Sequence, residues 1–297
     1  MTEQSTTPTP SKDGQHFQYD MAPQPLSFEV LKEKYCKGNE KTERDIFRRV
    51  AKGVASVEKT PQAQKYWEDA FFKMMVKGGV GAGRIMSAAG TGVQSTLMNC
   101  FVVPVGDALT GKDHNGLPGI YEALAQSAET LRRGGGVGYD YSAIRPKGAM
   151  VKSVLSRSSG PCSYMDVFDK SCKTIESAGV RRGAQMGVLR VDHPDIMEFI
   201  QAKREPGRWN NFNVSVNVSD AFMEALEAGA DWELVHEAQP HPDYEGYENI
   251  HQRADGKWVY KTLPAQELWD TIMKSNYDFA EPGVLFLDRA NATNTLS

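Results

Sequence analysis

One cysteine and two basic loops carry the side chains of this 297-residue chain that are best suited to chemistry. Cys100 follows Asn99 at the start of an apolar run, where a free thiol is either an inert core residue or a redox group. Arg181 and Arg182 lie in a glycine-flanked loop, and a second basic turn spans residues 145–148. Guanidinium groups bind phosphates and base edges through paired hydrogen bonds, but both loops are also compatible with solvated surface turns. The residue types alone leave these alternatives open.

The glycine-rich segment 78–83 is not a nucleotide-binding motif. A dinucleotide fingerprint requires glycine where Met86 stands, and a P-loop requires Lys-Ser/Thr after the last glycine. We therefore expect a turn with a close backbone approach. Asp107 lies in a turn and is by itself an ordinary capping residue. The four cysteines form no CxxC pair, which leaves zinc and thioredoxin-type motifs without support.

Composition restricts the class of protein. The chain is 40% hydrophobic and 24% charged, with a formal net charge of −4, and this argues against nucleic acid as a partner. No apolar run approaches the ~20 residues of a membrane helix, and the N-terminus has no apolar signal core. We expect a cytoplasmic protein that does not bind membranes.

Three regions follow from the sequence pattern. Residues 1–16 are polar and rich in proline and threonine, which predicts a disordered tail, and residues 17–82 have the apolar spacing of a small helical domain. Residues 83–297 alternate between strands and helices, which predicts an α/β fold with parallel pairing. The expected strands are 99–105, 137–144, 186–191, 213–218 and 283–287, and the expected helices are 120–133, 163–177, 196–203 and 265–280. We expect no helix after the last strand, so the fold should continue beyond the chain.

Several stretches, taken in order, resemble class II (adenosylcobalamin-dependent) ribonucleotide reductases. The resemblance covers roughly Gly83 to the end, and the residues before about Gly78 match only loosely. Long motifs in the family's order are far more specific than any one pattern. The stretches that carry it are LMNCFVVPVGD (97–107), RGGGVGYDYSAIRPKG (133–148), SGP (159–161), AGVRRGAQMG (178–187), LRVDHPDI (189–196) and GVLFLDR (283–289).

This resemblance implies a fold and a set of roles. The fold is the N-terminal half of a ten-stranded α/β barrel, preceded by a small helical domain. The activity is the radical conversion of ribonucleotides to deoxyribonucleotides under specificity control by a dNTP effector. Cys100 matches the redox-active reducing thiol, and Asn99, Arg181 and Ala184 match substrate-binding positions. The effector-binding positions are Asp107, Arg145, Lys147, Ser177, Gly179 and Arg182.

The resemblance also implies partners that the chain does not contain. The family's Asn-Pro-Cys-Gly-Glu finger loop and its Asp-x-His-x-x-Gly cobalt-ligand motif do not occur in this sequence. We therefore expect the chain to be inactive alone and to need a C-terminal half, which would bind most of the adenosylcobalamin. A thioredoxin-type reductant and a homodimer formed by helices 120–133 and 163–177 are also implied.

Two alternatives stay open at this stage. In the first, the chain is a non-catalytic module that binds dNTPs and dimerises. In the second, it is a fragment of the iron-dependent class I of the same family. The sequence leaves open whether the substrate is a diphosphate or a triphosphate.

Overall fold

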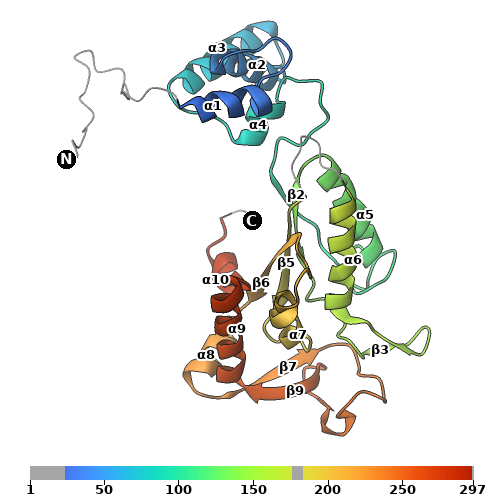
Figure 1. Cartoon of the computed structure of the whole chain (residues 1–297). Coiled ribbons are helices and arrows are strands. Elements are labelled where there is room, and N and C mark those ends of the chain that lie inside the picture. The colour runs from blue at the N-terminus through green and yellow to red at the C-terminus, as the bar shows by residue number, and fades with distance from the viewer. Residues whose placement is uncertain (1–23, 176–182, 296–297) are drawn as a thin grey trace, which may run out of the picture. The chain divides into compact units, whose positions relative to one another are not determined.

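The structure, a computed structural model, describes residues 24–175 and 183–295. The chain divides between Asn99 and Cys100 into a helical unit and an α/β unit (Figure 1). The tail expected at residues 1–16 lies outside the described ranges.

The helical unit contains four α-helices and one π-helical turn among its described residues. Thr42 begins α2 through a capping box with Asp45, and Thr60 caps α3 directly before Pro61. The elements are α1 (Pro25–Val30), η1 (Leu31–Tyr35), α2 (Glu43–Ala55), α3 (Pro61–Val76) and α4 (Gly83–Ala88).

The boundary between the units lies later than the one we expected at 82/83. Met86 on α4 and Ala89 just after it are buried in the core of the helical unit, together with Ile46 and Val50 of α2. α4 therefore belongs to the helical unit, because the apolar side chains that follow Gly83 complete its core.

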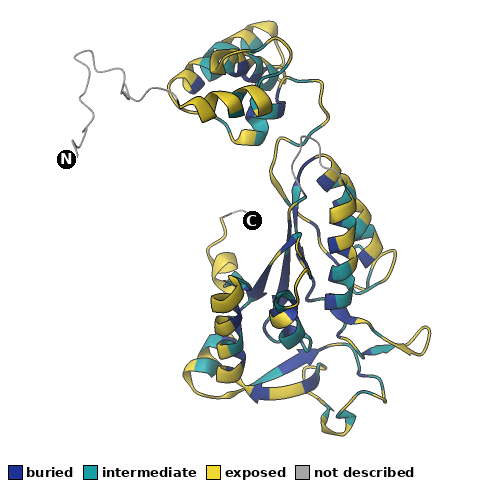
Figure 2. Ribbon diagram, in the orientation of Figure 1, coloured by how far each residue is buried: buried dark blue, intermediate teal, exposed yellow. Residues whose placement is uncertain are grey.

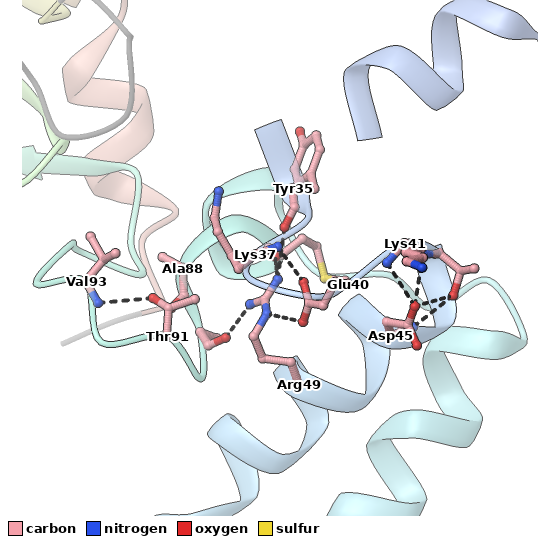
Figure 3. A network of polar contacts seen from close by, with 12 residues as sticks. Tyr35, Lys37, Glu40, Lys41, Asp45, Arg49, Ala88, Thr91 and Val93 are labelled. Atoms are coloured by element: carbon pink, nitrogen blue, oxygen red, sulfur yellow. Dashed lines mark hydrogen bonds and ion pairs between the residues drawn. The ribbon is translucent and has the colours of Figure 1, made fainter. Parts of the chain in front are cut away.

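A single arginine ties the separate segments of this unit together (Figure 3). The Arg49 guanidinium pairs with Glu40, with 2.7 Å between Nε and Oε1. It also donates hydrogen bonds to the carbonyl oxygens of Tyr35, Met86 and Ala89. These carbonyls belong to η1, α4 and the turn after α4, so one side chain satisfies the backbone ends of three segments.

We expect Arg49→Met to lower the free energy of unfolding of the helical unit by about 3 kcal/mol, because it leaves Glu40 and three carbonyl groups without their partner. Thermal and urea unfolding of the full chain measure this. Arg44→Met on the exposed face of the same helix is the matched control and should change stability little. Equal stability of the two variants would contradict the role of Arg49.

The α/β unit is built on a five-stranded sheet in which every neighbouring pair of strands is parallel (Figure 1). The strand order is β1-β2-β5-β6-β10. The strands are β1 (Cys100–Val102), β2 (Gly136–Asp140), β5 (Gln185–Arg190), β6 (Phe212–Asn217) and β10 (Gly283–Leu285). The helices are α5 (Ile120–Arg132), α6 (Gly160–Thr174), α7 (Ile196–Gln201) with η2 (Ala202–Arg204), α8 (Asp220–Glu227), α9 (Ala265–Phe279) and α10 (Leu287–Ala292).

The two faces of the sheet differ in what covers them. Alternate residues of a strand point to opposite faces, and strand register aligns those faces across the sheet. One face carries Val137, Tyr139, Leu189, Phe212, Val214 and Val216, which pack with side chains of α5 to α9 in the main core. The central strands of the sheet are coloured largely as buried in Figure 2. We call the other the open face, and none of its residues belongs to that core: Cys100, Val102, Gly136, Gly138, Asp140, Met186, Val188, Arg190, Asn213, Ser215 and Asn217. The expected α/β fold with parallel pairing is confirmed.

The structure corrects two expectations. Helix α10 follows β10, although we expected no helix there, because the run Leu287–Ala292 is also a good helix sequence. An antiparallel unit that we did not predict precedes α9. It consists of β7 (Asp231–His236), β8 (His251–Gln252) and β9 (Trp258–Pro264) in the order β7-β9-β8, with η3 (Tyr247–Asn249) in the connection. A small hairpin, β3 (Met150–Val151) with β4 (Ser156–Arg157), follows β2.

Candidate functional site

Cys100 lies on the open face at the start of the edge strand β1. Its thiol is free and the residue is exposed. Its partner in β2 is Gly136, and Val102, two residues on, is 84% exposed and pairs with Gly138. Since the two glycines have no side chain, β2 places nothing over the sulfur. Asn99 is also exposed, directly before β1.

The other two cysteines of the α/β unit are of a different kind. Cys162 and Cys172 are buried on α6, within the core that packs against the opposite face. Burial raises the pKa of the Cys172 thiol to about 11 and raises the pKa of Cys162 well above its usual value. Both are inert thiols at neutral pH, because the thiolate is the reactive form.

Polar and small side chains continue across the open face on β6. Asn213 is exposed, Ser215 is buried, and Asn217 has a buried Oδ1 with no hydrogen-bond partner among the described residues. A side chain at Gly283 would begin 2.9 Å from the Ser215 hydroxyl, so β10 approaches closely here. A polar sheet face is unusual for a parallel sheet, whose strands are normally apolar on both faces.

A cavity of about 1160 Å³ lies at the carboxyl ends of β1, β2 and β5. We call it the strand-end cavity. Ligands of open α/β sheets bind at this end of the strands. Its walls come from the loop after β1 (Asp107 to Asn115), the loop after β2 (Ser142 to Arg145), the β3–β4 hairpin, Arg190 at the end of β5, and the antiparallel unit.

Asp107 and Arg145, two of the predicted effector-binding residues, meet in this cavity. The Arg145 Nε lies 3.1 and 3.0 Å from the two carboxylate oxygens of Asp107, and the Arg145 backbone N–H donates to Oδ1. The guanidinium also donates to the Met150 carbonyl oxygen at 2.7 Å. The pair joins the loops that follow β1 and β2 and leaves lone pairs and N–H groups free for a ligand.

Lys147 is not brought to the same place. It is exposed, it does not line the strand-end cavity, and its Nζ lies 3.8 Å from Glu198 of α7. Its backbone N–H donates to Asp195, a half-buried carboxyl whose pKa burial raises to about 7. The turn thus directs Arg145 into the cavity and Lys147 toward α7.

Four predicted site residues, Ser177, Gly179, Arg181 and Arg182, lie outside the described residues. Ala184 is described, is exposed, and accepts a hydrogen bond from the Val137 N–H directly before β5. Arg190 at the other end of β5 lines the strand-end cavity. At about 3.3 Å per residue, Ala184 and Arg190 are roughly 20 Å apart. Ala184 therefore does not lie at the strand-end cavity of its own chain.

Two buried histidines, His193 and His236, lie beside the loop after β2, and the sequence pattern assigned neither of them a role. The rings of His193 and His236 have centroids 5.5 Å apart. His193 Nε2 lies 2.9 Å from the Ile144 carbonyl oxygen, and its Nδ1 accepts the Asp195 N–H. Burial lowers the pKa of His193 to about 3 and that of His236 to about 4. Both rings are therefore neutral in the folded protein above these values.

These lowered pKa values predict acid sensitivity. The unfolded chain binds protons at histidine below about pH 6.5, whereas the folded chain does so only near pH 3 to 4. The stability that the two rings contribute is therefore present above pH 6.5 and is lost as the pH falls. Asp195 acts in the opposite direction, because its raised pKa removes stability as the pH rises from 3.8 to about 7.

Comparison with His193→Asn isolates the histidine contribution. We expect the stability advantage of the unmodified chain to fall by about 1.4 kcal/mol per unit between pH 6 and pH 4, measured by urea unfolding. For the exposed His251→Asn variant, the difference in free energy of unfolding from the unmodified chain should stay constant between pH 6 and pH 4. An advantage of His193 that does not change with pH would contradict a neutral buried ring.

Among the described residues, no group of three or more histidine, cysteine, aspartate or glutamate side chains is arranged to hold a metal ion. None of the helices in the described part of the chain has the length and apolar character needed to cross a bilayer.

The parallel sheet has helices on one face, a partly polar open face and a ligand-sized cavity at the strand ends, which is the arrangement expected of part of an α/β barrel. The model of the ribonucleotide reductase barrel domain matches residues 98–297, and that of the ribonucleotide reductase all-alpha domain matches residues 21–94. The chain belongs to the ribonucleotide reductase large-subunit family.

Similar proteins include two vitamin B12-dependent ribonucleoside-diphosphate reductases. The one from Thermoplasma acidophilum is 37% identical over 199 residues, which is 67% of this chain and 23% of the relative. The one from Mycobacterium tuberculosis is 38% identical over 199 residues, 67% of this chain and 25% of the relative. A ribonucleoside-diphosphate reductase subunit alpha from Chlamydia muridarum is 26% identical over 262 residues, 82% of this chain and 24% of the relative. The chain thus spans about a quarter of the length of these relatives.

Proposed function

We propose that this chain is the N-terminal portion of a class II ribonucleotide reductase and that Cys100 is one of its two reducing thiols. The observation that carries the proposal is the free, exposed sulfur on the open face, beside two glycines of β2. The identity of 37% and 38% to relatives named as vitamin B12-dependent reductases supports class II. The relatives' names favour a ribonucleoside diphosphate as substrate.

The proposed reduction step uses two thiols. The 2′ hydroxyl of the ribose leaves as water, the carbon gains a hydrogen, and two thiols supply two electrons and two protons as they become a disulfide. Cys100 is one of them. Cys162 and Cys172 do not fit as the second, because they are buried among the helices on the other face. The second thiol and the radical cysteine would come from the remainder of the full-length protein, and a thioredoxin-type reductant would reopen the disulfide.

We include adenosylcobalamin in the proposal because two of the similar proteins are named vitamin B12-dependent reductases. It supplies the radical when bound. The described residues provide no cluster of metal ligands for its cobalt, so none of them is assigned to it and no step of this chain is derived through it.

Replacement of Cys100 tests the proposal. In the full-length reductase, we expect Cys100→Ser to bind ribonucleotide normally but to lose multiple turnover with thioredoxin by at least ~10³-fold, since serine cannot form the disulfide. Cys36→Ser in the helical unit is the control and should remain active. Unchanged turnover by Cys100→Ser would exclude Cys100 as a reducing thiol. The chain alone should form no deoxynucleotide.

We further propose that the strand-end cavity binds a dNTP effector. Its volume of about 1160 Å³ accommodates a nucleotide, and Asp107 and Arg145 offer an acceptor for the ribose hydroxyl and donors for phosphate. The same site supports the second candidate function, a dNTP-binding module without catalysis, because it requires only described residues.

We propose the homodimer because Ala184, a predicted substrate-binding residue, lies roughly 20 Å from the strand-end cavity of its own chain. α5 and α6 pack side by side on the surface and expose Tyr121 and Val167 (Figure 1). A two-fold pairing of these helices in opposite directions would bring Ala184 of one chain toward the strand-end cavity of the other.

Calorimetry with dTTP tests the effector site. We expect Asp107→Asn to weaken binding about tenfold, because the amide is a poorer acceptor and a poorer partner for Arg145. Asp231→Asn, exposed on β7 and outside the cavity lining, is the control. Absence of dTTP binding by the unmodified chain would exclude both the effector site and the binding-module alternative.

A further inference from the structure

The antiparallel unit β7–β9–β8 is held firmly against the loop that carries Arg145. The Met150 N–H donates to the Gln239 carbonyl oxygen at 2.8 Å, and the His241 N–H donates to the Gly148 carbonyl oxygen at 3.1 Å. The Tyr244 ring lies directly against Gly148, where an added Cβ would be 2.8 Å from the ring. The unit is therefore a fixed wall of the strand-end cavity.

The turn between β8 and β9 determines which of its two cations faces that cavity. Gly256, with φ of +87°, closes the turn, and the Arg253 N–H donates to the Lys257 carbonyl oxygen at 2.8 Å. Arg253 is neutralised by Glu233 and Asp255 at 3.1 and 2.8 Å. Lys257 is half-buried and lines the strand-end cavity together with Trp258.

The charges that line the cavity do not balance. Asp107 pairs with Arg145, Arg190 with Asp192, and His114 lies near Glu237. The Asp113 carboxylate accepts three backbone N–H groups. Among the described residues, three lining cations form no ion pair: Lys152, Arg157 and Lys257. The lining side chains include five Lys or Arg cations but only three carboxylates (Asp107, Asp113 and Glu237), and this excess of positive charge favours an anionic ligand.

Lys257 differs from the other two cations in its burial and in the hydrogen bonds of its backbone. Lys152 and Arg157 are exposed on the β3–β4 hairpin, where solvent can stabilise them. The Lys257 ammonium extends from a half-buried residue whose backbone is fixed by the turn and by a hydrogen bond from its N–H to Asp255. The backbone that carries Lys257 is therefore held in place beside the cavity.

We propose that Lys257 binds the polyphosphate of the effector in the strand-end cavity, so that the antiparallel unit is part of the effector site. This inference rests on the proposed effector function of that cavity. It adds a binding residue from a sheet that lies far along the chain from Asp107 and Arg145. Lys152 and Arg157 would approach the same polyphosphate from the β3–β4 hairpin.

The test compares dTTP, dTDP and thymidine as calorimetric probes of the full chain. Lys257→Gln should weaken dTTP binding about tenfold, dTDP binding less, and thymidine binding not at all, because only the phosphates meet the ammonium. Lys261→Gln removes the same charge from an exposed position of β9 outside the cavity and should bind dTTP normally. Lys257→Arg retains the charge and should restore most of the dTTP affinity.

The outcomes separate this inference from the proposed function. If Lys257→Gln binds dTTP as tightly as the unmodified chain, the role of Lys257 is wrong and the effector site stands. An equal loss for thymidine and dTTP would assign Lys257 a structural role and overturn the inference. If the unmodified chain binds no dTTP, both the effector site and the inference fail. Thermal unfolding of each variant checks that the fold is intact.

Discussion

The parallel register of the five-stranded sheet is the constraint on which the rest of this structure depends. Because alternate residues face opposite ways, a shift of one residue in β1 would move Cys100 from the open face into the core beside α5 and α6. The observed register pairs Cys100 with Gly136 and keeps the apolar side chains of β2, β5 and β6 together on the other face. The same strands therefore supply one set of side chains to the core and a different set to the open face.

The second organising feature is the meeting of loops at the carboxyl ends of these strands. The Asp107–Arg145 pair joins the loops after β1 and β2, and neutral His193 contacts the second of these loops at the Ile144 carbonyl oxygen. Backbone hydrogen bonds from Met150 and His241 then add the antiparallel unit. A cavity built from segments so far apart in sequence has a defined shape only when the whole α/β unit is folded.

Much of this was predictable from residue patterns, and the failures have physical causes. The strands 137–144, 186–191 and 213–218 were recognised because apolar residues recur along each short stretch, and the helix 120–133 because its apolar spacing ends at three glycines. The antiparallel unit was missed although Asp255-Gly256 is a hairpin signal and Trp232 and Leu234 alternate with charged residues. Its long polar connection hid the pairing of β7 with β9.

Of the predicted site residues, Asp107 and Arg145 share a cavity because their loops follow neighbouring strands, a relation that sequence order indicates. The direction of a side chain is not contained in such a pattern, and Lys147, two residues from Arg145, extends toward Glu198 instead. His193 and His236 were not found because a buried neutral histidine has no sequence signature of its own. Its function follows only from the carbonyl oxygens and N–H groups that surround it.

The position of β5 inside the sheet has a mechanical consequence. β5 is bonded along its length to β2 on one side and to β6 on the other, so it cannot stretch or slide independently of its neighbours. A displacement of Ala184 along the strand would have to break these ladder hydrogen bonds or carry β2 and β6 with it. Communication between the two ends of β5 within one chain would therefore require the sheet to move as a body.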